Sequence, residues 1–439
     1  MTLTAAQGPT GSTTTSSLSS SSLSSSSLTT ATPTRRREVW PAAGFALTVV
    51  GWGANQFAPL VLLYRQRLDM SPAIAEAVFG LYALGLIPGL LVAGPLSDRI
   101  GRRPTVVFAV ALSMLAGGVL MLGPHGVGWL FLGRVLMGVA SGSAFSAGSA
   151  WIKELSAAPH SDAPAGSGAR RASMAMTVGF GLGPLTAGLL AQWGPAPMVL
   201  PYVPQLILGA FALWLARRVP ETVQRWTSGV LGDGLLRLRG FADRRFVGVV
   251  LPLAPWVFGS ATTAMVYLPG LAAGHVSGIS LAFAGTAAML TALSGVCVQP
   301  FARRFAAGSS AARPRLLALG LGLVTVGTLA SAGIAALDDI GGWQALLALA
   351  NGVEMGCGYG VLMVFGLSEV QRLAPAEDLA GMTAVFQAFT YVGFALPYLL
   401  SSLKSLASPS ELLLGVAVLA AMTLAFTLWQ AGRTAPAEN

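Results

Sequence analysis

The stretch Gly94-Pro95-Leu96-Ser97-Asp98-Arg99-Ile100-Gly101-Arg102-Arg103-Pro104 is a short charged turn between two long apolar runs. These runs cover about residues 73–96 and 105–122, and each is close to the roughly 20 apolar residues that cross a bilayer as a helix. The pattern therefore predicts a tight hairpin between two membrane helices. Its three arginines favour the cytoplasmic side of the membrane. A plain positively charged turn would explain the arginines, but not the aspartate or the spacing of the glycines.

The composition is that of an integral membrane protein. Of the 439 residues 54% are hydrophobic and 10% are charged, the mean hydropathy is +0.68, and a soluble domain carries about 25% charged residues. The net charge of +9 is spread over short loops, which indicates membrane topology rather than a nucleic-acid-binding face. The excess of arginine over lysine, with much Ala, Gly and Leu, is typical of a high-GC bacterial genome.

Twelve apolar runs predict an all-α membrane protein with twelve spans. We expect the spans at about residues 39–63, 73–97, 104–123, 127–152, 172–193, 197–216, 246–272, 278–301, 315–337, 342–367, 379–403 and 410–431. With the amino end inside, 22 of the 26 Lys and Arg residues fall on the cytoplasmic side and three on the outer side. This bias predicts a multi-pass protein of the plasma membrane with both termini in the cytoplasm.

The segments outside the spans divide the chain. Residues 1–37 are a Ser/Thr-rich stretch that cannot bury a core, so we expect a disordered cytoplasmic tail, with an organellar targeting peptide as the alternative. A six-helix half at 38–216 and another at 246–432 flank a cytoplasmic loop at 217–245, in which Val230–Phe241 is expected to form an interfacial helix. Residues 433–439 form a second cytoplasmic tail.

The two halves also look like a repeat. Gly94, Arg102 and Arg103 recur 201 residues later as Gly295, Arg303 and Arg304, while Asp98 becomes Gln299. Two similar halves of six spans suit a transporter in which one half rocks against the other.

The first hairpin resembles the signature loop of the major facilitator superfamily, G-x-L-x-D-R-x-G-R-R. The matching residues are Gly94, Leu96, Asp98, Arg99, Gly101, Arg102 and Arg103. The resemblance covers residues 38–432 and implies the major facilitator fold, with two pseudo-symmetric halves. It also implies that this loop is a conformational latch, in which Asp98 meets the amino end of the eleventh span near residues 378–382. Asp378 itself stands where an N-cap would and could compete for that contact.

Spans 4 and 5 carry two further matches. Arg134 and Gly138 resemble the family's R-x-x-x-G pattern, and a buried arginine is costly unless it is paired or faces water; snorkelling to the interface is the alternative. Gly179, Gly183, Pro184 and Gly188 resemble G-x-x-x-G-P-x-x-G-G of the drug/proton antiporter branch, with Ala187 in place of one glycine. That resemblance favours export. The alternative is an ordinary kinked, glycine-rich span that says nothing about direction.

The same resemblance places the central cavity along spans 1, 4, 7 and 10. The candidate substrate-cavity residues on these spans are polar or aromatic: Asn55, Gln56, Trp256, Thr263, Tyr267, Asn351 and Tyr359. Hydrogen bonding between helices is an equally good explanation for most of them. Such a cavity would suit a moderately lipophilic organic substrate.

Glu354 is the carboxylate expected nearest the bilayer midplane. Burial disfavours its charged form, so we expect Glu354, with Arg134, to take part in proton coupling. A protonated carboxyl bonded between helices, or a fixed ion pair with Arg134, is the alternative. Glu76, near the outer end of span 2, is the second candidate for the proton site.

The sequence thus predicts a secondary active transporter that exports drugs or metabolites in exchange for protons by alternating access. An uptake or facilitative carrier for sugars or other nutrients is the alternative. We expect no enzymatic activity and no cofactor, because the sequence has no G-x-S-x-G, H-E-x-x-H or P-loop motif. We expect no metal site, because Cys297 and Cys357 lie within spans and the three histidines lie in loops. The expected partners are a small-molecule substrate, protons and the lipid bilayer, with no nucleic acid, and we expect a monomer.

Overall fold

A computed structural model describes residues 38–164, 166–223, 243–308, 312–337, 342–375 and 378–433. Throughout these ranges the regular structure is helical, and they contain no strand. The expected tail at 1–37, the expected helix at 230–241 and the last six residues of the chain lie outside the described residues.

The first six spans follow the predicted order. They are α1 (Trp40–Asn55) with α2 (Phe57–Arg67), α3 (Pro72–Gly80) with α4 (Tyr82–Ile100), α5 (Arg102–Leu120), α6 (Val127–Ser143) with η2 (Ala144–Gly148) and α7 (Ser149–Leu155), α8 (Ser167–Trp193), and η3 (Leu200–Tyr202) with α9 (Val203–Ala216). A short turn of helix, η1 (Gly123–His125), joins α5 to α6.

The last six spans start after the central loop. They are η5 (Phe246–Val250), α10 (Leu251–Thr262), η6 (Thr263–Tyr267), α11 (Leu268–Ala272) and η7 (Ala273–His275) in one span, then α12 (Ser280–Gly308), α13 (Ala312–Ala336), α14 (Gly342–Leu373), α15 (Leu379–Val392) with η8 (Gly393–Ala395), α16 (Leu396–Ser402) and η9 (Leu403–Ser405), and α17 (Pro409–Arg433). Within the described residues eleven helices are long and apolar enough to cross a membrane, and Leu200–Ala216 is a shorter apolar helix. The predicted twelve-span, all-α architecture is confirmed.

Two spans of the first half are broken near their middle. The first is interrupted at Gln56, between α1 and α2, and the second at Leu81, between α3 and α4. Pro59 accounts for the first break, because it has no N–H to donate to the carbonyl of Asn55 four residues earlier. Both breaks leave helix ends inside the first half, where the carbonyls of the last turn need other donors.

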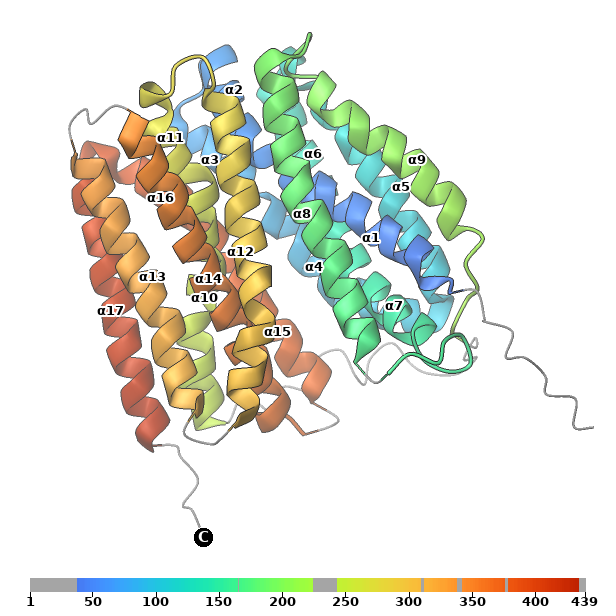
Figure 1. Ribbon diagram of the computed structural model, residues 1–439. Helices are drawn as coiled ribbons and strands as arrows, with labels where there is room; N and C mark the ends of the chain where they lie inside the picture. Colours follow the sequence, from blue (N-terminus) through green and yellow to red (C-terminus); the bar gives the residue numbers. More distant parts are fainter. Residues whose placement is uncertain are drawn as a thin grey trace, which may run out of the picture. The chain divides into compact units, whose positions relative to one another are not determined.

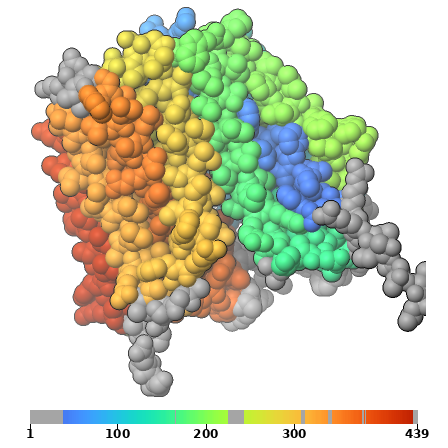
Figure 2. Space-filling view, viewed as in Figure 1, coloured from blue at the N-terminus to red at the C-terminus, as the bar shows by residue number. Residues whose placement is uncertain are grey.

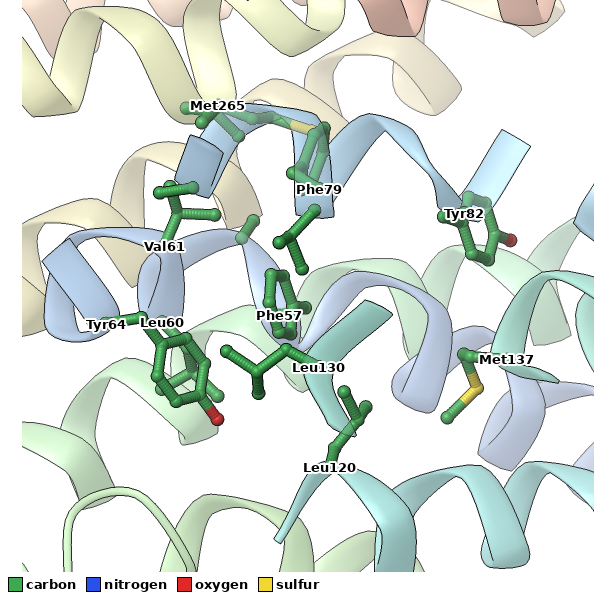
Figure 3. Packing of buried hydrophobic residues seen from close by; sticks show 14 of the residues in the cluster. Phe57, Leu60, Val61, Tyr64, Phe79, Tyr82, Leu120, Leu130, Met137 and Met265 are labelled. Carbon is green, nitrogen blue, oxygen red and sulfur yellow. The ribbon is translucent and has the colours of Figure 1, made fainter. Parts of the chain in front are cut away.

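The buried apolar residues form several clusters, and one of them joins the two halves of the molecule. One buried cluster, which includes Leu47, Val110 and Trp151, belongs to the first half alone, and another, which includes Phe246 and Leu317, belongs to the second half alone. The third cluster combines both halves. It joins residues such as Phe57, Phe79 and Leu130 to Met265, Leu281 and Phe394, and Figure 3 shows Met265 beside the ring of Phe79.

The combined cluster lies at the far end of the spans, the end opposite the signature loop 94–104. There α8 and α12 are side by side (Figures 1 and 2). The side-chain amide of Gln192 donates to Gly278 O at 2.9 Å and accepts from Leu281 N at 2.8 Å. Further contacts join α3 to α16 and α2 to α12. In Figure 1, α8 and α12 diverge toward the other end, which we call the loop end. The halves are therefore closed at the far end.

Candidate substrate site

A cavity lies between the two halves near the middle of the spans. It is lined by Asn55, Phe79, Tyr82, Phe145, Phe180, Phe258, Ala261, Thr262, Met265, Ala292, Tyr359, Tyr391 and Phe394. The space between its lining atoms, counted together with the part open to solvent, is about 540 Å³. Both halves contribute residues, as expected for a site whose access changes when the halves move.

Aromatic rings dominate this lining, and they stack on one another across the boundary between the halves. The ring of Phe394 lies 5.5 Å from Phe79 and 5.3 Å from Phe258, centroid to centroid. Phe258 also stacks on Tyr391 at 4.8 Å. The stacked rings close the cavity toward the far end, because Phe79 and Phe394 belong to the core that both halves share there.

Few polar groups accompany these rings. Among the thirteen lining residues, Asn55, Thr262 and three tyrosines carry polar side-chain atoms, and none is charged. The hydroxyl of Thr262 lies 3.2 Å from Gly393 O, to which it donates. The cavity can therefore bind flat apolar groups through ring contacts, with a small number of hydrogen bonds to fix their orientation.

Two of the predicted cavity residues, Asn55 and Tyr359, line this cavity. Gln56 is next to Asn55 but is fully buried, and its amide has no hydrogen-bond partner among the described residues. Thr263 is buried and donates to Gly259 O of its own span, at 2.8 Å, whereas the neighbouring Thr262 faces the cavity.

The structure places the other three predicted cavity residues away from it. The indole of Trp256 donates to the hydroxyl of Thr423 on α17, at 3.1 Å. Asn351 donates to the hydroxyl of Ser331 on α13, at 2.7 Å, so both make the helix-to-helix hydrogen bonds considered as the alternative. Tyr267 is buried in the far end of the second half.

Seven of the eight aromatic cavity residues were absent from the sequence prediction, although Phe79 and Tyr82, like Tyr391 and Phe394, lie three residues apart within one predicted span. Spans that are apolar on every side give no periodic signal that tells the lipid face from the cavity face.

Arg134 is fully buried beneath this site, so the snorkelling alternative is wrong. Its guanidinium donates to Ala54 O at 3.1 Å and to Phe79 O at 2.9 Å. These carbonyls lie in the last turns of α1 and α3, at the two breaks, so one cation caps two helix ends. Three rings surround it: its Cζ lies 4.7 Å from the ring centres of Phe57 and Tyr82 and 5.3 Å from that of Phe79.

Glu354 occupies a different environment. It is half-buried on the face of α14 that also carries the exposed Ala350 and Val353, and it is not part of the cavity lining. Gly327 of α13 faces it, since an added Cβ on this glycine would lie 3.8 Å from Glu354 Cδ. No ion pair joins Glu354 to Arg134 among the described residues, so the structure does not bring the two predicted coupling residues together.

The signature loop forms a compact ionic network within the first half. Arg102 pairs with Asp98, at 2.5 Å, and with Glu154 of α7, at 3.0 Å. The side chain of Asp98 is 60% exposed, and the described part of α15 gives it no hydrogen bond. Asp378 is at the N-cap position of α15 but makes no capping bond. The predicted contact of Asp98 with the eleventh span is thus absent from this conformation, which is closed at the other end.

Glu221, just after the sixth span, binds the signature loop through backbone hydrogen bonds. Its two carboxylate oxygens accept from Arg102 N at 2.8 Å and Arg103 N at 2.9 Å, at the start of α5. Gly101 has a φ of +109°, and a Cβ there would lie 2.4 Å from Glu221 Oε2, so both its φ and its contact require glycine. Arg99 and the 36%-exposed Leu96 complete the motif on α4.

The second copy of the loop is simpler. Gln299 accepts from Arg303 at 3.2 Å, which replaces the aspartate–arginine pair of the first copy. A separate ionic cluster lies nearby in the second half, where Glu369 accepts from Arg245 and from Arg372, both at 2.7 Å. Arg245 is 124 residues away from Glu369 along the chain, and the three residues follow no motif, so the cluster was not predicted.

The motif of span 5 has two different faces. A Cβ on Gly179 would lie 2.2 Å from Thr48 O, and one on Gly183 would lie 2.6 Å from Trp52 O, so both glycines pack against α1. Gly188 and Pro184 instead pack against Gly285 of α12, in the other half. The glycines permit the close backbone approach that tight helix pairs require.

Comparison with known proteins now identifies the family. Residues 42–397 match the model of the Major Facilitator Superfamily, and the chain belongs to this family of transporters. It is a multi-pass membrane protein.

Individual relatives differ in what they carry. Human solute carrier family 2, facilitated glucose transporter member 6, is 35% identical over 161 residues, which are 34% of this chain and 30% of the relative. Multidrug resistance protein MdtL of Klebsiella pneumoniae is 30% identical over 100 residues, 20% of this chain and 25% of the relative. The chain thus spans less than a third of either relative's length. A crystal structure of the peptide transporter POT shares the fold, with a TM-score of 0.71, 16% identity, and coverage of 91% of this chain and 96% of that one.

Proposed function

We propose that this transporter exports moderately lipophilic organic compounds, such as drugs or metabolites, in exchange for protons. The observation that carries the proposal is the cavity between the halves, in which eight of thirteen lining residues are aromatic and none is charged. A sugar presents hydroxyl groups on all sides, and each needs a partner when water is excluded. Rings that stack on flat apolar groups suit a lipophilic guest better.

The charge pattern and the conformation support loading from the cytoplasm. With the Arg-rich loops inside, the loop end faces the cytoplasm and the far end faces outward. The halves are closed at the far end, so this conformation is one that loads substrate from within. The resemblance of Gly179, Gly183, Pro184 and Gly188 to the antiporter motif favours export. We place the transporter in the plasma membrane as a monomer with both termini in the cytoplasm.

Proton coupling needs a carboxyl group that changes its protonation as the halves move. Glu354 was the first candidate from the sequence and Glu76 the second. Glu76 is buried at the boundary between the halves, whereas Glu354 is half-buried and has the exposed Ala350 and Val353 as neighbours on α14. Arg134 then acts as a fixed charge that holds the broken helices beneath the cavity.

A facilitative sugar carrier is the second candidate. It is favoured by the 35% identity to a human protein named as a glucose transporter, and the hydroxyls of Tyr82, Tyr359 and Tyr391 could serve a sugar.

Reconstitution into proteoliposomes separates the two functions. We expect a pH gradient to drive the lipophilic dye Hoechst 33342 across the membrane, and Phe258→Ala to reduce this transport at least several-fold. Phe301→Ala is the matched control, because Phe301 is 67% exposed on α12 and is not part of the cavity lining. Exchange of D-glucose without any dye transport would contradict the proposal.

A further inference from the structure

Glu76 is a buried acid that does not line the aromatic cavity. It lies in α3, is 2% exposed, and its Oε2 has no hydrogen-bond partner among the described residues. The helix that carries it packs against α16 of the other half. Glu76 is therefore located in the far-end closure, on the opposite side of the stacked rings from the cavity.

The groups that face Glu76 come from both halves. Ser401 of α16 and Lys404 of η9 belong to the second half, as does Tyr267 of η6, while Arg65 of α2 belongs to the first. The ammonium group of Lys404 lies 5.7 Å from the centre of the Tyr267 ring. Among the described residues, Lys404, Arg65 and Tyr267 are the charged or titratable groups that face this carboxyl.

The polar atoms at this place are incompletely satisfied. The hydroxyl of Tyr267, like Glu76 Oε2, is buried without a hydrogen-bond partner in the described structure. Neither Lys404 nor Arg65 comes within ion-pair distance of Glu76. These two atoms come one from each half, so they face each other only while the halves are closed at the far end.

The protonation of Glu76 follows from these contacts. A buried carboxylate is costly unless it is paired and fully hydrogen-bonded, and here its second oxygen has no donor. Lys404 and Arg65 are each partly exposed, so solvent screens their attraction for a negative charge. A neutral carboxyl, by contrast, gains an O–H group that can donate to an unpartnered hydroxyl.

We propose that Glu76 binds a proton when the halves close at the far end and releases it when they separate. On closure, a proton from water on that side forms one O–H bond with the carboxylate. On opening, the bond breaks, the proton returns to water, and the hydrated carboxylate is left ionised. This inference rests on the proposed function and goes beyond it. Because the proton comes from and returns to water on the same side, Glu76 makes closure of the far end depend on the pH there, a step separate from proton transport across the membrane.

The test is the pH dependence of the conformation, measured on the full-length protein in nanodiscs without substrate. Spin labels are attached at Ile74→Cys and Leu406→Cys, which are both exposed at the far end, in a protein with Cys297 and Cys357 replaced by alanine. Double electron–electron resonance between the labels then reports the distance between the halves. We expect the closed population to grow as the pH falls, by at most about tenfold per pH unit in the closed-to-open ratio for one proton.

Two variants make the test specific. Glu76→Gln should stay closed at every pH, because it is neutral, whereas Glu354→Gln should keep the wild-type pH dependence. Lys404→Gln removes a facing cation and should shift the transition to higher pH, which provides a second test if Glu76→Gln fails to fold. A wild-type pH dependence in Glu76→Gln, or none in the wild type, would overturn the inference. Because no substrate is used, failure of dye transport would refute the proposed export and leave this result standing.

Discussion

Replacing Arg134 by lysine or by methionine distinguishes the geometry of the guanidinium from its charge. The native side chain donates to two carbonyls and is surrounded by three rings, but it has no carboxylate partner among the described residues. Arg134→Lys keeps the buried charge but can reach one carbonyl at best. It loses one charge-assisted hydrogen bond, about 1.5–3 kcal/mol, and the stacking of a planar group, about 0.5–1 kcal/mol or more.

Arg134→Met loses both hydrogen bonds, about 3–6 kcal/mol, and the same stacking, about 0.5–1 kcal/mol. However, it also removes the cost of burying a charge, which amounts to several kcal/mol. We therefore expect a destabilisation of about 2–5 kcal/mol for Arg134→Lys and about 0–3 kcal/mol for Arg134→Met. The lysine variant should be the less stable of the two.

Tryptophan fluorescence during unfolding in mixed detergent–SDS micelles measures these free energies. Arg433→Met is the control, because Arg433 is exposed at the end of α17 and stacks on Trp429 at 4.2 Å, an exposed contact that contributes about 0.5–1 kcal/mol. If Arg134→Met lost more stability than Arg134→Lys, the cost of burying the charge would not offset the two lost hydrogen bonds, which contradicts this reasoning. If neither variant lost more stability than the control, the helix caps would not be stabilising.

The helix contacts and the signature loop lead to three more predictions. Gly138→Ala should lower the free energy of unfolding by about 1–3 kcal/mol, because its Cβ would lie 2.2 Å from Tyr82 O. Gly118→Ala, with nothing within 4 Å of the added Cβ, should be neutral. Equal thermal stability of the two variants would count against tight packing of α4 on α6. Glu221→Gln should cost about 1.5–3 kcal/mol in the same unfolding assay, since it removes a charged acceptor from two backbone N–H groups, and an unchanged value would mean that Glu221 does not hold the loop. Asp98→Asn should impair dye transport in proteoliposomes without affecting membrane insertion, and Gln299→Ala should matter much less; an equal loss from both would refute the latch.

The sequence predicted the spans well, because hydropathy and loop charge depend on short stretches of chain. The predicted span at 127–152 corresponds to Val127–Leu155, and the one at 342–367 to Gly342–Leu373. Most differences are helix ends that continue beyond the apolar run: α8 already begins at Ser167, so Arg170 and Arg171 form part of its first turns.

The site was predicted less completely, for a physical reason. Asn55 and Tyr359 line the cavity as expected, but in a membrane helix the lipid face and the cavity face are both apolar, so side-chain direction has no periodic signal. The burial of Arg134 was foreseen, whereas its role as a cap was not, because the two carbonyls that it caps lie 80 and 55 residues away along the chain. Glu221 stood in a loop with no visible partner, and its partners lie more than 100 residues away.

The most direct test of the central claim is protection of the cavity by substrate. Ala292→Cys introduces a thiol into the cavity lining of a protein in which Cys297 and Cys357 are replaced by alanine, and a membrane-impermeant maleimide is added from the loop end. We predict that the thiol is labelled from that side and that a transported lipophilic dye slows the labelling, while D-glucose has no effect. Labelling that D-glucose slows and the dye does not would contradict an aromatic cavity built for lipophilic export.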